Sequence, residues 1–237
     1  MPTAFELISE DFSGQLSTLR RLIDKAYAPG PSIDADLRLA TSNAAVLLLA
    51  STFEEFLRQL IRAYTEHLVT NASTFGDLPD TLRTAIWERA LYKLKSAKYG
   101  TRLFDRPLAE LSVRQITTFC LEEKLSVPVS DLIAYNENNT KTVELNSMFK
   151  RVGISDYCGI VGRRSELVDF FGAADGNRAH ASFTSALDAF YDARNSIAHS
   201  IGSHMGSGQS EILRNIDLFH IVSDVMSDDL GTRVSFA

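Results

Sequence analysis

A short stretch near the C-terminal end of the chain combines side chains that could act on an anionic substrate. Arg194, Asn195 and His199 occur together in YDARNSIAHS, residues 191–200. An arginine guanidinium forms two parallel hydrogen bonds to a phosphate, and a histidine exchanges protons near neutral pH because its ordinary pKa is about 6.5. The stretch therefore offers anion binding and proton transfer, neither of which needs a metal ion.

Helical geometry places these side chains on different sides of one helix. At about 100° per residue, Arg194 falls within an apolar stripe, and His199 points about 140° away from Arg194. Asn195 and His199 are four residues apart and share the neighbouring flank of the helix. The apolar stripe consists of Leu187, Phe190, Ala193, Ile197 and Ile201.

An arginine within an apolar stripe has two explanations. In the structural one, Arg194 extends its head to solvent, His199 interacts with the helix dipole in the last turn, and Gly202 ends the helix. In the functional one, the stripe faces a groove or a partner that compensates the buried charge. Because only a long, bent arginine could meet His199 on the same helix, a second copy of this helix would favour the functional explanation.

Apolar residues recur with helical spacing along nearly the whole chain, and no segment shows the sustained alternation of a strand. The two prolines and the glycine of residues 28–32 separate the first two helices. Asp34 is placed to cap the second helix. We expect an all-α protein with helices at about 5–27, 34–70, 78–96, 108–125, 143–151, 163–172, 182–200 and 211–229.

Net charge, cysteine content and the length of apolar runs argue against several classes of protein. The formal net charge is −6 and the sequence pI is about 5.4, which argues against a protein that coats nucleic acid without specificity. Two cysteines without a C-x-x-C motif do not suggest a disulfide scaffold or a zinc site. The sequence shows no secretory signal and no apolar run long enough to span a membrane, so we expect a cytoplasmic protein without membrane association.

Residues 83–106 form a locally basic segment. Seven basic and two acidic residues give this segment a net charge of +5. Such a segment is either a set of solvated helix faces or a groove that follows an RNA backbone. Trp87 and Tyr92 lie among these residues and could stack on bases, although packing in a helical core is the commoner use of such aromatics. The candidate RNA contacts are Arg89, Lys93, Lys95, Lys98 and Arg102.

No other pattern suggests a catalytic or cofactor site. His67, His180 and His220 have no neighbours at metal-ligand spacing, and we interpret them as structural or surface residues. His204 lies in a Gly/Ser-rich loop and is a weaker candidate for an RNA contact. Because phosphate-binding glycine motifs and a nucleophile elbow are also missing from the sequence, we expect neither a metal nor a cofactor.

Two stretches resemble the HEPN superfamily of small helical proteins. RNSIAH, residues 194–199, is similar to its R-x4-H motif, although Ser200 follows the histidine where glycine is frequent. AAVLLLASTFEEFLRQLI, residues 44–61, resembles an early helix of the RiboL-PSP-type HEPN branch, whose aromatic-Glu-x-aromatic-Leu pattern matches Phe53 to Leu57. The resemblance covers residues 34–70 and 182–229 and leaves 97–180 unaligned.

The resemblance implies a fold and an assembly. We expect one HEPN-like domain over residues 1–237, built as a HEPN-like helical bundle with additional helices, in which 97–180 is an inserted or accessory helical region. Active HEPN proteins are homodimers whose arginines and histidines meet in a cleft at the dimer interface. An antitoxin or regulatory protein would be a further partner.

The resemblance also implies a metal-independent endoribonuclease in toxin–antitoxin, antiviral or stress defence. His199 would be the general acid and base, and Arg194 would bind the phosphate. Asn195 would orient the site, and Glu54 on the early helix would position the arginine. The RNA 2′-hydroxyl would attack the adjacent phosphorus, leaving a 2′,3′-cyclic phosphate and a 5′-hydroxyl. The alternative is a noncatalytic HEPN-type module that binds RNA or protein.

Overall fold

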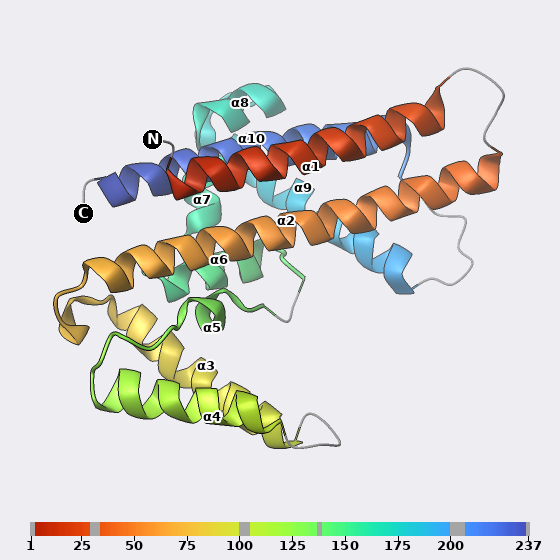
Figure 1. The fold of residues 1–237 in the computed structure, drawn as a ribbon. Coiled ribbons are helices and arrows are strands. Elements are labelled where there is room, and N and C mark those ends of the chain that lie inside the picture. Colours follow the sequence, from red (N-terminus) through yellow and green to blue (C-terminus); the bar gives the residue numbers. More distant parts are fainter. Residues whose placement is uncertain (1–2, 29–33, 100–104, 137–138, 200–206, 236–237) are drawn as a thin grey trace. The chain divides into compact units, whose positions relative to one another are not determined.

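The computed structural model describes residues 3–28, 34–99, 105–136, 139–199 and 207–235. These residues form helices joined by turns and short loops, and no strand occurs among them (Figure 1). The expectation of an all-α protein with a HEPN-like bundle and additional helices is therefore confirmed. Within the described ranges, no helix combines the length and the hydropathy that crossing a lipid bilayer requires.

The chain divides into two compact units. The first consists of Met1–Leu57, Asn139–Glu144 and Cys158–Ala237, and the second of Arg58–Asn138 and Leu145–Tyr157. Three of the four boundaries fall inside helices, so composition does not mark those three. Residues 97–180, expected to form one inserted or accessory region, contribute to both units.

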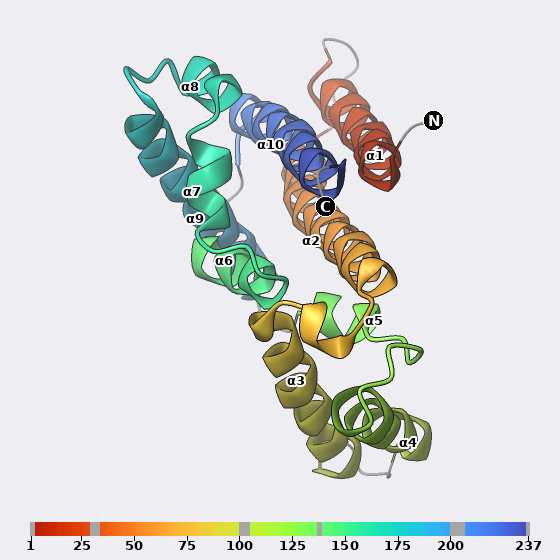
Figure 2. The same cartoon turned by 90° about the vertical axis from the view of Figure 1, so that its left-hand side faces the viewer.

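The first unit contains the two ends of the chain. Its long helices are α1 (Ala4–Tyr27), the first part of α2 (Ala35–Asn71), α9 (Gly176–His199) and α10 (Gln209–Ser235). Shorter helices are α7 (Tyr157–Gly162), most of which belongs to this unit, and α8 (Ser165–Phe171). Helices α1 and α10 lie side by side, as Figure 1 and Figure 2 both show.

Aromatic side chains join these helices. Phe219 of α10 lies between two rings, with centroid distances of 4.4 Å to Phe53 of α2 and 4.9 Å to Phe190 of α9. Phe12 of α1 stacks on Phe56 of α2 at 4.6 Å. All five rings are buried, so the apolar face of α9 is fixed against α10 by large side chains that cannot shift without leaving a cavity.

Side-chain caps set several helix ends. Oδ1 of Asp34 accepts the N–H of Leu37 at 2.8 Å, so the predicted N-cap of α2 is confirmed. Helix α9 begins at Gly176, six residues before the expected start at 182. Oδ1 of Asp175 accepts the N–H groups of Asn177 and Arg178, both at 2.9 Å, and this cap outweighs the helix-breaking tendency of the glycine.

The second unit includes the C-terminal part of α2, from Arg58 onward. It contains η1 (Phe75–Asp77), α3 (Asp80–Tyr99), α4 (Arg106–Arg114), the π-helical segment η2 (Gln115–Leu121), α5 (Ser130–Ala134) and residues 145–151 of α6 (Thr142–Arg151). The single helix expected at 108–125 is thus an α-helix followed by a wider π-helical turn. Helix α3 packs against both of them.

Candidate active site on helix α9

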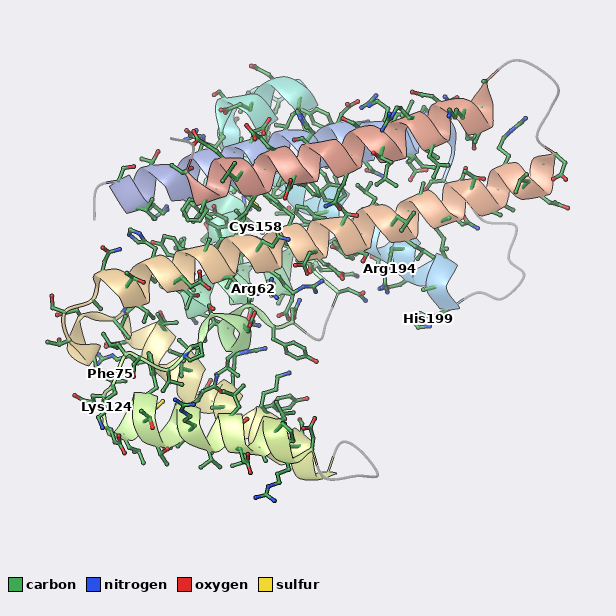
Figure 3. The ribbon with its side chains drawn as sticks, in the orientation of Figure 1. Arg62, Phe75, Lys124, Cys158, Arg194 and His199 are labelled. Atoms are coloured by element: carbon green, nitrogen blue, oxygen red, sulfur yellow. The ribbon has the colours of Figure 1, made fainter. Side chains whose placement is uncertain are left out.

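The C-terminal turns of α9 carry the residues that the sequence singled out. The earlier turns are anchored by five buried side chains, Ala179, Phe183, Leu187, Phe190 and Tyr191. From Asp192 to His199 no residue is buried. Figure 3 labels Arg194 and His199 on this part of the helix. A rigidly packed helix therefore presents the Arg–Asn–His motif on its less covered end.

Arg194 is half-buried, and its guanidinium is incompletely satisfied. Its Nη1 donates a hydrogen bond of 3.2 Å to Oδ1 of the neighbouring Asn195. Its Nε is buried and has no hydrogen-bond partner among the described residues. A guanidinium has five N–H donors and no acceptor, and a buried donor without a partner is costly. Nε of Arg194 is therefore a donor of the motif that the described residues leave unpaired.

Asn195 connects Arg194 to a segment far away in the sequence. Oδ1 of Asn195 also accepts a hydrogen bond of 2.8 Å from Nδ2 of Asn139. Asn139 begins a four-residue segment, residues 139–142, which we call the strap. This polar stretch directly precedes the helix that the sequence predicts at about 143–151. Its Asn, Lys and Thr residues are types that bond to other backbone and side-chain groups, but nothing in the sequence shows that their partners lie on α9.

His199 is the exposed last residue of α9. Because five helical residues turn the side-chain direction by about 140°, Arg194 and His199 of one chain leave α9 on different sides. Only a long, bent arginine could bring its head to the same ligand as His199 within one helix.

Glu54 lies on α2 as a half-buried residue, and its Oε1 is buried. In the described part of the chain, no ion pair joins Glu54 to Arg194. The expected role of Glu54 in positioning the arginine stays a prediction.

The basic residues proposed to contact RNA lie in the second unit and have different environments. Nε of Arg89 donates to the carbonyl oxygen of Leu132 at 2.8 Å, and its Nη2 donates to that of Tyr135. Nζ of Lys93 lies 3.1 Å from the ring centroid of Tyr135. Arg89 therefore satisfies carbonyls at the end of α5, and Lys93 makes a cation–π contact.

The remaining basic candidates are less constrained. Lys95 is exposed on α3, whereas the side chain of Lys98 and all of Arg102 lie outside the described residues. Trp87 and Tyr92 are 38% and 48% exposed. The interpretation that these two aromatics pack in the core is therefore wrong, because each ring is exposed on its own side of α3.

The other residues considered from the sequence make no comparable cluster. Among the described residues, no group of three His, Cys, Asp or Glu side chains could hold a metal ion. His220 lies 3.8 Å from Asp224 on the same helix, and His204 lies outside the described residues. The Arg–Asn–His end of α9 is thus the strongest candidate site.

The amino-acid sequence was compared with models of protein families. The RiboL-PSP-HEPN family model matches residues 10–231, which is nearly the whole chain. The chain belongs to the RiboL-PSP-HEPN family. The HEPN match runs through residues 97–180, which the short motifs left unaligned, so the family resemblance covers segments of both units. No curated protein and no solved structure matched the chain.

Proposed function

We propose that this HEPN protein is a metal-independent endoribonuclease that acts as a homodimer. The observation that carries the proposal is the unpaired guanidinium donor of Arg194, which belongs to the family's R-x4-H motif. Its guanidinium has a buried donor without a partner in the part of the chain that the structure describes, and it lies beside Asn195 on the less covered end of α9. Such a site suits the phosphate of a nucleic acid better than a neutral ligand.

The chemistry follows from the substrate and from three side chains. The RNA 2′-oxygen attacks the adjacent phosphorus, the bond from phosphorus to the 5′-oxygen breaks, and a 2′,3′-cyclic phosphate and a 5′-hydroxyl result. His199 moves the protons of these two oxygens, as a general acid and base does. Arg194 and Asn195 donate hydrogen bonds to the phosphate oxygens and stabilise the charge that develops in the transition state.

A dimer accounts for the geometry of the helix. Because Arg194 and His199 of one chain diverge, the proposal assigns the missing side of the site to a second copy. Ala193 and Ile197 continue the apolar stripe beyond its buried part and are half-buried, so they offer apolar surface to a partner helix. Glu54 retains its proposed place as a positioning residue for the arginine.

RNA contacts beyond the cleavage site are assigned to basic residues of the second unit. The proposal keeps Lys95, Lys98 and Arg102 as contacts to the RNA backbone. Arg89 and Lys93 have contacts within the fold, and we assign them mainly to holding the end of α5. Action in the cytoplasm as a toxin or antiviral defence effector, with an antitoxin or regulatory partner, completes the proposal and rests on HEPN membership.

A noncatalytic HEPN-type module is the second candidate. Trp87 and Leu91, four residues apart on α3, are both exposed, and a binding partner could cover them. This observation fits binding of RNA or protein and requires no activity from His199.

A cleavage assay separates the two candidates. Purified wild type, Arg194→Ala and His199→Ala are incubated with a panel of RNAs in the presence of EDTA. We expect cleavage by the wild type, with 2′,3′-cyclic phosphate ends, and loss of at least about a hundredfold in each variant. His220→Ala, an exposed histidine on α10, is the matched control. Equal cleavage by all proteins would overturn the nuclease proposal, and binding without cleavage by the wild type would favour the module.

A further inference from the structure

The strap joins three positions on one side of α9. Asn139 bonds to Asn195, Lys141 forms an ion pair with Asp192, and Thr142 donates to Asp188. The three acceptors are spaced four and three residues apart, so they follow one face of the helix. All of these residues belong to the first unit. The strap therefore runs along the motif-bearing part of α9 and contacts the motif itself through Asn139.

The orientation of the Asn195 amide follows from its partners. Arginine has no acceptor, so the atom of Asn195 that faces Nη1 of Arg194 is the carbonyl oxygen Oδ1. The same Oδ1 faces Asn139, so Asn139 presents its Nδ2 donor. Two donors on one oxygen hold the amide against the flip that would exchange its oxygen and nitrogen.

The fixed orientation of the Asn195 amide leaves its Nδ2 available as a hydrogen-bond donor. With Oδ1 held by Asn139 and Arg194, Nδ2 of Asn195 points the other way, and among the described residues it bonds to no protein group. Each amide nitrogen carries two N–H donors. Beside the guanidinium of Arg194, these donors suit a second oxygen of the same phosphate.

We infer that Asn139 is a positioning residue of the nuclease site, which orients Asn195 so that its amide donors face the substrate phosphate. This inference rests on the proposed function. Asn139 touches no substrate itself; it acts through Asn195, and the strap holds it in place through Lys141 and Thr142. The cleavage site thus includes a segment distant in sequence from the R-x4-H motif.

The kinetic test replaces Asn139 by alanine, which removes the donor, and by aspartate, which keeps the size but offers only acceptors. We expect kcat to fall about tenfold in both variants, with a smaller change in KM, because one oriented transition-state hydrogen bond is weakened. Val143→Thr is the matched control, since Val143 follows the strap and is 81% exposed. Unchanged kcat in Asn139→Ala and Asn139→Asp would overturn the inference.

A double-mutant cycle distinguishes positioning from a general structural role. If Asn139 acts through Asn195, Asn139→Ala has no further effect on kcat in an Asn195→Ala background. An equal loss in both backgrounds would show that Asn139 supports the fold rather than the amide, and would also overturn the inference.

A measurement without substrate keeps the inference separate from the proposed function. In the side-chain amide NMR spectrum, Asn139→Ala should shift the NH₂ resonances of Asn195 and speed their exchange with water, while Val143→Thr leaves both unchanged. If wild type cuts no RNA but this effect occurs, the proposed function fails and the positioning contact stands. Unaltered Asn195 resonances would show that the contact does not orient the amide, whatever the activity.

Discussion

Thr142 donates two hydrogen bonds to the same carboxylate oxygen of Asp188, from its backbone N–H at 2.8 Å and from its hydroxyl at 2.9 Å. Thr142 is the first residue of α6, where backbone N–H groups lack partners within the helix. The carboxylate of Asp188 also carries the charge that a helix N-terminus favours. One side chain of α9 therefore caps α6 and holds the strap.

Asp188→Ala should destabilise the protein through this contact. The backbone N–H of Thr142 loses its acceptor and its hydroxyl keeps only the carbonyl oxygen of Thr184 at 3.4 Å, so we expect the free energy of unfolding to fall by about 1–3 kcal/mol in urea denaturation. Asp192→Ala is the matched control, because it removes the more exposed ion pair with Lys141 and should cost less than about 1 kcal/mol. Equal losses in the two variants would contradict this ranking.

Ile197→Glu should weaken self-association. Ile197 is half-buried near the end of the apolar stripe, and two copies of a glutamate facing each other across a two-fold axis would repel. Analytical ultracentrifugation should show a dimer for the wild type and monomers for the variant, with RNA cleavage reduced in parallel. Ser196→Glu adds the same charge at the exposed neighbouring position and should keep the dimer. A monomeric wild type that still cuts RNA would refute the dimer.

Arg89 and Lys95 should respond differently to alanine substitution. Arg89→Ala removes the Nε donor from the carbonyl oxygen of Leu132 and leaves that of Tyr135 with the Nη1 donor of Arg151 at 3.0 Å, so it should lower the melting temperature. Lys95→Ala should leave the melting temperature unchanged. It should instead make the slope of log binding constant against log salt concentration less steep by about one, which corresponds to the loss of one phosphate contact. An unchanged salt slope would remove Lys95 from the RNA interface.

Cys120 should react slowly with alkylating agents. Burial raises the pKa of the Cys120 thiol, because a desolvated thiolate is disfavoured. The thiolate fraction at pH 8 is therefore smaller than that of free cysteine, and alkylation by iodoacetamide should be slower and keep rising to higher pH. Cys120→Ser identifies the signal, because the remaining Cys158 is buried. A rate at pH 7 equal to that of free cysteine would contradict this expectation.

Glu6 should make folding more sensitive to acid. Hydrogen bonds from the backbone and the hydroxyl of Thr3 lower the pKa of the Glu6 carboxyl. A lowered folded-state pKa stabilises the protein above the unfolded-state pKa of about 4.3, and this stabilisation is lost as pH falls through the lower folded value. The difference in unfolding free energy between wild type and Glu6→Gln should thus be larger at pH 7 than at pH 3. Glu10→Gln serves as the control on the same helix.

Most helices of the fold could be predicted from the helical spacing of apolar residues. The bounds of α2 and the cap at Asp34 could be read from the sequence because local chemistry decides them. Helix α9 starts six residues before the start that its periodicity predicts, because the Asp175 cap outweighs the glycine that follows it. The π-helical turn after α4 and the exposure of Trp87 were also missed, because both depend on what packs against the helix.

The sequence by itself determined the helical class, the family motif and the divergence of Arg194 from His199, because each follows from residue type and from the fixed rotation of a helix. Only the tertiary structure decided that Asn139 reaches Asn195, that Nε of Arg194 is buried without a partner among the residues described, and that Arg89 is bound to carbonyl oxygens. Those relationships join residues tens of positions apart or depend on local packing, and no periodic pattern encodes which distant polar groups meet when the helices pack.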